Sequence, residues 1–258
     1  MGQVVDTPSA QEFMREAMQK ITVEELDAIE QEVAAKSERF QAALAPDHIA
    51  QLSEENWRAL FRMIFAVRRK TKGLLDGRVE SGWPERIHDL LYGDDDLAVR
   101  FDTFCDAFVQ LEPNIRYDFA SELLHYTHPD DYWLWTRWMW DPEIETGSLR
   151  LVTMDDFDLH GRTLGETYLK VGEALAFVNE TGQAAGFTRI GERTFGADVF
   201  LACVYAVYTY TILRLRMTNE FNKVMPELPE LARRLLGVWD KKAHGIRKAK
   251  LDGGNHAG

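Results

Sequence analysis

Apolar residues recur every three or four positions through most of this chain, which is the spacing of amphipathic helices. A clear case is the face formed by Trp57, Leu60, Phe61 and Ile64, which must be buried. Several such stretches begin with Ser or Thr followed three residues later by Glu, a pattern typical of helix starts. The pattern predicts helices over residues 9–20, 22–44, 53–72, 84–92, 94–111, 114–126, 130–139, 163–180, 196–217 and 226–240.

The segment between Asp141 and Gly161 departs from the helical pattern. Turn-forming and acidic residues surround a short apolar run there. This run predicts a strand at 149–153, and Phe187 to Ile190 is the stretch with which it would pair. We therefore expect a small two-stranded β element beside the helices.

The chain shows no internal repeat and no long linker. We predict a mainly α fold, with residues 1–240 forming a single irregular helical bundle. Within it, residues 9–44 form an N-terminal helical pair that either lies against the core or projects from it. Residues 241–258 are predicted to form a basic flexible tail.

The helix at about 196–217 contains an almost entirely apolar run, VFLACVYAVYTYTIL. A bilayer crossing needs about 20 such residues, and this run of fifteen ends at Asp198 and Arg214 and includes five hydroxyl groups. The run is therefore typical of a helix buried at the centre of a soluble protein. We do not expect a membrane as a partner.

The chain is acidic, with 30 Lys and Arg against 42 Asp and Glu among 258 residues, a net charge of −12. This balance argues against nucleic acid or an anionic membrane binding over the whole surface. From Arg233 onward, however, seven basic and two acidic residues give +5, which leaves −17 for the rest. Nucleic-acid contact through this basic tail and residues 68–78 is therefore kept as an alternative.

The two cysteines, Cys105 and Cys203, are flanked by apolar residues. Both are expected to be small buried hydrophobic residues in a reducing compartment. The first ten residues lack the apolar core of a secretion signal. We therefore expect a cytoplasmic location.

One tryptophan-rich segment holds four of the seven Trp, at Trp133, Trp135, Trp138 and Trp140. On a helix, the first and last would share one side and the middle two the other. Either the segment is sandwiched inside the core, or an open face binds another protein or a flat ligand. Arg137 could stack on an indole or pair with a carboxylate or phosphate. These five side chains are the predicted partner-binding or ligand-binding residues.

Just before this segment, Glu122, His125 and His128 follow one another at intervals of three, which would place them on one side of a helix. Glu-x-x-His is the spacing that di-iron helical bundles use for metal ligands. A second copy occurs at Glu85 and His88. The three residues are thus candidate catalytic groups and the first two candidate metal ligands, with a hydrogen-bonded structural His125 as the alternative.

Other motifs of catalysis are missing from the sequence. It has no glycine-rich phosphate loop, no serine-hydrolase motif and no zinc-protease motif. The first hypothesis is therefore a non-catalytic interaction or assembly protein that binds another protein or a second copy of itself. The alternative is a helical metal-binding or cofactor-binding enzyme with its site near Glu122, and we name no specific cofactor.

Overall fold

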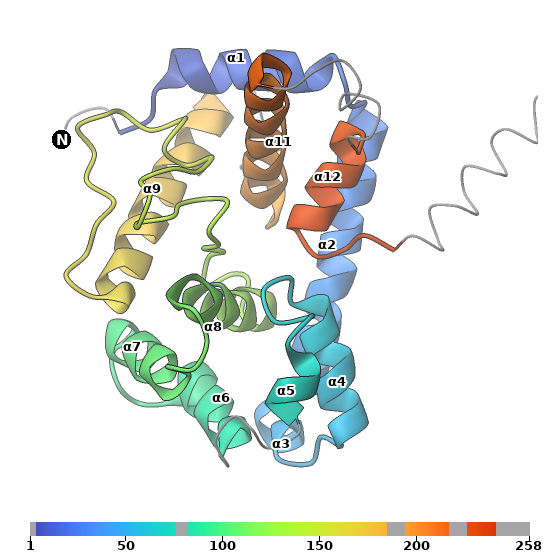
Figure 1. Ribbon diagram of the computed structural model, residues 1–258, viewed down its shortest axis with the longest axis vertical. Coiled ribbons are helices and arrows are strands. Elements are labelled where there is room, and N and C mark those ends of the chain that lie inside the picture. Colours follow the sequence, from blue (N-terminus) through green and yellow to red (C-terminus); the bar gives the residue numbers. More distant parts are fainter. Residues whose placement is uncertain (1–3, 76–81, 185–193, 217–225, 241–258) are drawn as a thin grey trace, which may run out of the picture.

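Helices make up most of the chain in the computed structural model, which describes residues 4–75, 82–184, 194–216 and 226–240 (Figure 1). The mainly α class is confirmed. The helices are α1 (Thr7–Met18), α2 (Val23–Ala43), α3 (Pro46–Ile49), α4 (Glu54–Met63), α5 (Thr71–Leu75), α6 (Trp83–Tyr92), α7 (Leu97–Ala107), α8 (Pro113–Thr127), α9 (Leu164–Ala184), α11 (Gly196–Arg216) and α12 (Leu228–Leu235).

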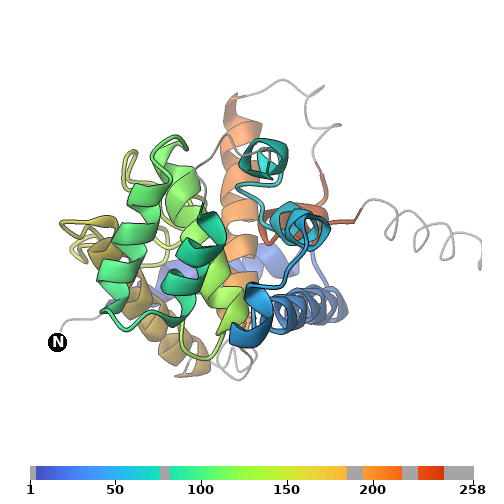
Figure 2. The ribbon, with the colours of Figure 1, turned by 90° about the horizontal axis from the view of Figure 1, so that it is seen from below.

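Helix α8 lies at the centre of the fold (Figures 1 and 2). Every residue from Tyr117 to Thr127 is buried, and α2, α6 and α7 pack around the helix. Helix α11 is the predicted apolar helix, and its first half, from Ala197 to Val204, is buried on every side. Among the described residues, no helix combines the length and the apolar composition that a membrane crossing requires.

The N-terminal helices pack against this centre. Helix α1 contacts α11, and α2 contacts α8, α11 and α12. Figure 1 shows α1 across one end of α11 and α2 along one edge of the molecule. The predicted start of α2 is confirmed, because Thr22 and Glu25 accept hydrogen bonds from each other's backbone amides.

The predicted helix over 53–72 is interrupted. Helix α4 ends at Met63, Ile64 adopts an extended conformation, and α5 begins only at Thr71. The side chains of Ile64 and Val67 are fully buried although their backbone forms turns. Apolar spacing therefore continues through the break, and this is why periodicity alone did not reveal it.

The predicted helix over 130–139 was wrong, because the tryptophan-rich segment consists of turns and extended backbone. Two of its backbone amides donate to side chains of α8 instead of to a helix of their own. The Trp135 amide donates to Ser121 Oγ at 2.5 Å, and the Arg137 amide to Asp118 Oδ1 at 2.7 Å. The polar groups of α8 thus replace the hydrogen bonds that a helix would supply.

The predicted strand at 149–153 does not form either. Thr153 makes an isolated bridge with Val5, and the residues just before it form a turn in which Val152 is fully buried. The described residues contain isolated bridges and no sheet. The expected pairing stretch, 187–190, lies outside the described residues.

Trp133 packs on α9 at a glycine. Its ring stacks on Tyr168, with centroids 4.8 Å apart, and its Nε1 donates to the Tyr168 carbonyl oxygen at 2.8 Å. A Cβ at Gly172 would overlap the indole ring, whereas a Cβ at Gly73 would meet nothing within 4 Å. Because Gly172 has no side chain, the Trp133 indole can pack directly against α9.

We expect Gly172→Ala to lower the free energy of unfolding by about 1–3 kcal/mol, because the indole must move or the tryptophan-rich segment must shift away from α9. The matched control, Gly73→Ala in α5, should be neutral or stabilise by up to about 1 kcal/mol. Urea unfolding followed by circular dichroism measures both. Equal stabilities of the two variants would contradict the packing described for Trp133.

Candidate functional site

Glu122 of α8 forms a buried ion pair with Lys36 of α2. Glu122 Oε2 lies 2.9 Å from Lys36 Nζ, and each side chain is only 3% exposed. The same Nζ donates to the Leu236 carbonyl oxygen at 3.1 Å and lies 3.8 Å from the centroid of the Tyr126 ring. Burial lowers the pKa of Lys36, and the Glu122 carboxylate opposes this effect. The pair joins α2, α8 and the end of α12.

His125, one helical turn further along α8, forms a second buried pair with Asp198 of α11. Its Nε2 lies 2.8 Å from Asp198 Oδ2, and its Nδ1 lies 2.9 Å from the Tyr132 carbonyl oxygen. Burial lowers the pKa of His125, but the Asp198 carboxylate and the two hydrogen bonds outweigh burial and raise it overall. Both ring nitrogens face acceptors, so the imidazolium form is favoured.

The two ion pairs form one cluster in which the positive and negative charges balance. The Asp198 carboxylate acts on Lys36 as well as on His125, and Lys36 in turn opposes protonation of His125. Two cations and two anions therefore share the interior where α2, α8 and α11 meet. We call Lys36, Glu122, His125 and Asp198 the core charge cluster.

The predicted metal ligands are thus engaged by protein groups. Glu122 bonds Lys36, and both nitrogens of His125 have protein partners. Among the described residues, no three His, Cys, Asp or Glu side chains are grouped as a metal site would require. His128 lies at the end of α8, against the edges of the Tyr92 and Tyr132 rings, outside the core charge cluster.

Arg137 pairs with a carboxylate, one of the two roles expected for it. Its Nε donates to Asp118 Oδ2 at 2.9 Å, and its backbone amide donates to the other oxygen. Burial raises the pKa of Asp118 to about 7, and Arg137 only partly opposes this. The pair fixes the tryptophan-rich segment to α8.

Three of the four tryptophans in that segment lie inside the core. Trp135, Trp138 and Trp140 are at most 3% exposed. Trp135 stacks on Tyr117 with centroids 4.2 Å apart, and its Nε1 donates to the Trp140 carbonyl oxygen at 2.9 Å. Trp133 is half-buried against α9. The segment is therefore sandwiched inside the core.

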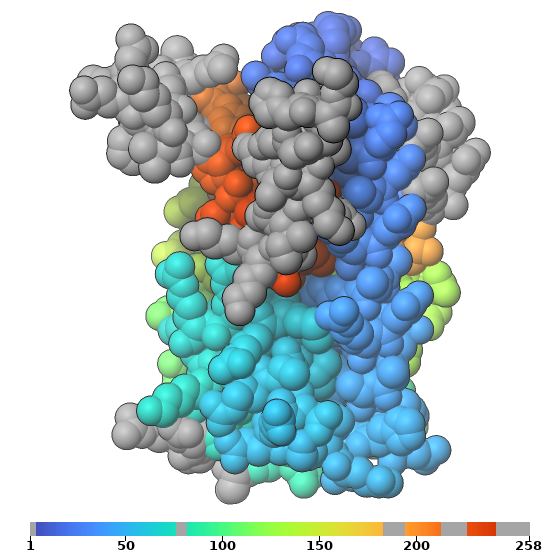
Figure 3. Space-filling model, turned by 90° about the vertical axis from the view of Figure 1, so that its right-hand side faces the viewer, coloured from blue at the N-terminus to red at the C-terminus, as the bar shows by residue number. Residues whose placement is uncertain are grey.

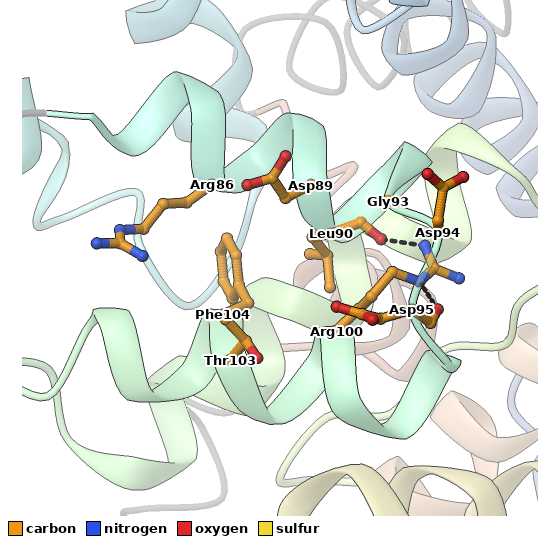
Figure 4. Close-up of a pocket in the computed structure, with 9 residues that line it drawn as sticks. All are labelled: Arg86, Asp89, Leu90, Gly93, Asp94, Asp95, Arg100, Thr103 and Phe104. Carbon is orange, nitrogen blue, oxygen red and sulfur yellow. Dashed lines mark hydrogen bonds between the residues drawn. The ribbon is translucent and has the colours of Figure 1, made fainter.

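A pocket of about 440 Å³ lies between α6 and α7 (Figure 4). It holds three aspartates, but Figure 4 shows the Arg100 guanidinium already turned to backbone oxygens. Arg100 Nη1 donates to the Leu90 carbonyl oxygen at 2.5 Å, and its Nε donates to that of Asp95 at 3.0 Å. Arg100 thus caps the end of α6, and the pocket is part of the turn between the helices.

A larger groove, of about 850 Å³, lies between α2, the end of α4 and the segment after α12. Figure 3 shows this face, with α2 and α4 side by side. Gly237, with φ +72°, lies so close to the Met63 carbonyl oxygen that a side chain there would collide with it. The lining residues are Glu32, Ala35, Lys36, Arg39, Arg62, Met63, Gly237, Val238, Trp239 and Asp240.

Three cations, Lys36, Arg39 and Arg62, and two carboxylates, Glu32 and Asp240, line this groove. Glu32 pairs with Arg233 at 2.7 Å, and Lys36 pairs with Glu122. Arg39 and Arg62 are exposed, and neither forms an ion pair with the residues that the structure describes. Two guanidinium groups therefore line the groove without an ion pair to a described residue, although the Asp240 carboxylate lines the same groove.

Three further arginines lie on neighbouring segments, Arg68 and Arg69 in the turns after α4 and Arg234 on α12. Arg234 pairs with Glu230 of the same helix at 2.5 Å, and burial together with the charges of Arg69 and Arg234 lowers the pKa of Arg68. Arg68 lies 4.5 Å from the centroid of the Phe65 ring, and Arg234 lies 5.7 Å from that of Trp239. We call the groove lined by Arg39 and Arg62 the arginine groove.

Sequence reasoning missed the arginine groove. It included residues 68–78 in a basic stretch, but Arg39 and Arg62 belong to separate helices and meet only in the fold. One feature of the sequence pointed to this surface: Glu32, Lys36 and Arg39 are spaced so that they lie on one side of the predicted helix.

Comparisons of the chain with models of protein families, with curated proteins and with solved structures found no match. The function is therefore argued from the geometry and charge of its own residues.

Removing one partner of the Lys36–Glu122 pair should be costly. We expect Lys36→Met or Glu122→Leu alone to lower the free energy of unfolding by about 3–5 kcal/mol, because the remaining charge is buried without a partner. The double variant should lose less than the sum of the two. Urea unfolding of all four proteins gives the coupling energy, and strictly additive losses would contradict the pairing.

The His125–Asp198 pair should make stability depend on pH. Because the folded pKa of His125 is raised, its contribution is complete below the unfolded value of about 6.5 and is lost as pH rises through the folded pKa. We expect the stability of wild type to fall over the pH range above about 6.5, and that of His125→Gln to fall less. Urea midpoints across this range measure it, with exposed His48→Gln as the control. A variant slope equal to that of wild type would contradict the assignment.

Proposed function

We propose that this chain is a binding protein that acts through an interaction and not through catalysis, and that it contacts an anionic partner at the arginine groove. The proposal rests on the charge of one part of the surface. Two exposed arginines, Arg39 and Arg62, line a groove of about 850 Å³ on a chain whose net charge is −12. Anionic groups are the ligands that guanidinium forks bind best.

The electrostatics of the groove support this proposal. Bringing like charges together costs folding free energy, and a bound anion removes that cost. Arg39 and Arg62 form no ion pair with described residues, although the chain carries 42 Asp and Glu side chains. An anionic partner therefore gains these guanidinium groups without first displacing an acidic side chain in the described part of the protein.

The state of the acid–base groups favours binding over catalysis. His125 and Glu122 are the strongest candidates for proton transfer in the sequence, yet each is 3% exposed and is bonded to a protein partner. A general acid or base must come within hydrogen-bond reach of its substrate. Instead, Glu122 faces Lys36 and His125 faces Asp198 inside the core charge cluster.

Retention on immobilised heparin, a sulfated polyanion, tests the proposal. We expect the protein to bind at about 50 mM NaCl despite its acidity, and Arg39→Gln/Arg62→Gln to elute at clearly lower salt. The control Lys20→Gln/Arg162→Gln removes the same charge from exposed positions outside the groove and should elute with wild type. Absence of retention, or equal loss in both double variants, would overturn the proposal.

A further inference from the structure

We infer that Asp118 and Arg137 form a pH-sensitive latch, in which ionised Asp118 holds the Arg137 guanidinium against α8 and protonated Asp118 releases it to solvent. The inference goes beyond the proposed function, because it concerns the tryptophan-rich segment and not the arginine groove. It rests on the unequal burial of the two partners, on the bonds that the carboxylate accepts and on the charges around it.

The two partners of the latch are buried to very different extents. The side chain of Asp118 is only 2% exposed, whereas that of Arg137 is 34% exposed. The carboxylate has therefore lost its hydration, while the guanidinium keeps part of its own. In the Lys36–Glu122 pair, by contrast, both side chains are 3% exposed. The Asp118 pair therefore has one partner that can turn into solvent without giving up a fully buried position.

The Asp118 carboxylate accepts two hydrogen bonds from Arg137. Its Oδ2 accepts from the side-chain Nε at 2.9 Å, and its Oδ1 accepts from the backbone amide at 2.7 Å. Hydrogen bonds to an ionised group are roughly twice as strong as neutral ones. Protonation of the carboxylate therefore weakens its hold on the side chain and on the backbone of Arg137 together.

The charges close to Asp118 favour its protonation around neutral pH. Burial raises its pKa to about 7, since Arg137 only partly opposes the effect of burial and Glu122, one turn along the helix, adds to it. Burial also raises the pKa of the neighbouring Tyr117, so that its phenol stays uncharged. Arg116 of the same helix donates to a carbonyl oxygen of α7. Arg137 is thus the cation that holds Asp118 in its ionised form.

Charged groups on the helices around α8 serve other contacts. Lys36 of α2 and Asp198 of α11 belong to the core charge cluster. Arg100 of α7 donates to a carbonyl oxygen at the end of α6, and Asp102 of α7 accepts from a backbone amide of α9. Helix α7 meets α8 through aromatic rings that pack against Phe119. The charged groups of α6 that line the pocket between α6 and α7 are Arg86 and Asp89.

The rest of the tryptophan-rich segment stays attached when the latch opens. The Trp135 amide donates to Ser121 Oγ, and His125 Nδ1 bonds the Tyr132 carbonyl oxygen. Neither contact uses Asp118. Protonation therefore frees a guanidinium at the surface and leaves the core closed. Below the switching pH, Arg137 can bind a carboxylate or a phosphate of a partner, and above that pH its own carboxylate occupies it.

NMR spectroscopy of the full chain tests the latch at Arg137 itself. The backbone amide of Arg137 bonds the titrating carboxylate, so we expect its resonance to follow a single protonation with a midpoint near pH 7. The heteronuclear NOE of the Arg137 Nε–H group should fall below this midpoint, because the released guanidinium becomes mobile. A side chain that stays rigid at every pH would overturn the release even if the amide titrates.

Variants assign the transition to the pair. Asp118→Asn keeps the shape of the side chain and removes its charge, so the transition should disappear. Arg137→Gln removes the cation that opposes protonation and should raise the midpoint, read at the amide of residue 137, by about 1–3 pH units. Arg137→Lys keeps a positive charge and should remain closer to wild type. The control His125→Gln removes the other titrating group buried on α8 and should keep the wild-type midpoint.

Two results would overturn the assignment to Asp118. One is a transition that persists in Asp118→Asn, and the other is a midpoint that does not move in Arg137→Gln. The second result decides the question even if Asp118→Asn fails to fold. Arg137→Gln should stay folded, because Asp118 takes up a proton when its partner is lost.

Discussion

Charge compensation along α8 is the constraint on which the rest of the structure depends. A helix buried over its last eleven residues must find partners for the charged groups that it carries. Asp118, Glu122 and His125 receive theirs from the tryptophan-rich segment, from α2 and from α11. An unpaired charge at any of these positions would cost several kcal/mol. The positions of three surrounding segments are therefore fixed by the side chains of one helix.

The ion pair between Lys36 and Glu122 also positions residues of the arginine groove. Lys36 lines the groove and lies one helical turn before Arg39 on α2. Because Lys36 bonds both Glu122 and the Leu236 carbonyl oxygen, it fixes the start of the segment that follows α12. Gly237 then lets that segment cross the end of α4 at close range. A buried ion pair in the interior thus determines the spacing of guanidinium groups at the surface.

Local signals in the sequence were sufficient for most helices. The capping box of Thr22 and Glu25 marks the start of α2. Pro84 marks the start of α6, and Gly93 marks its end. The tryptophan-rich segment could not be predicted, because distant side chains of α8 take its backbone amides. The groove could not be predicted either, since no local pattern brings Arg39 to Arg62. What escaped prediction in both cases is contact between residues far apart in the chain.

The long sequence separations within the core charge cluster have a consequence for folding during synthesis. Glu122 lies 86 residues after Lys36, Asp198 lies 73 after His125, and the Leu236 carbonyl lies 200 after Lys36. Lys36 therefore emerges from the ribosome long before its partners and stays hydrated while they are made. Non-local contacts of this kind slow folding and make it cooperative. The core charge cluster can close only after Leu236 has been translated.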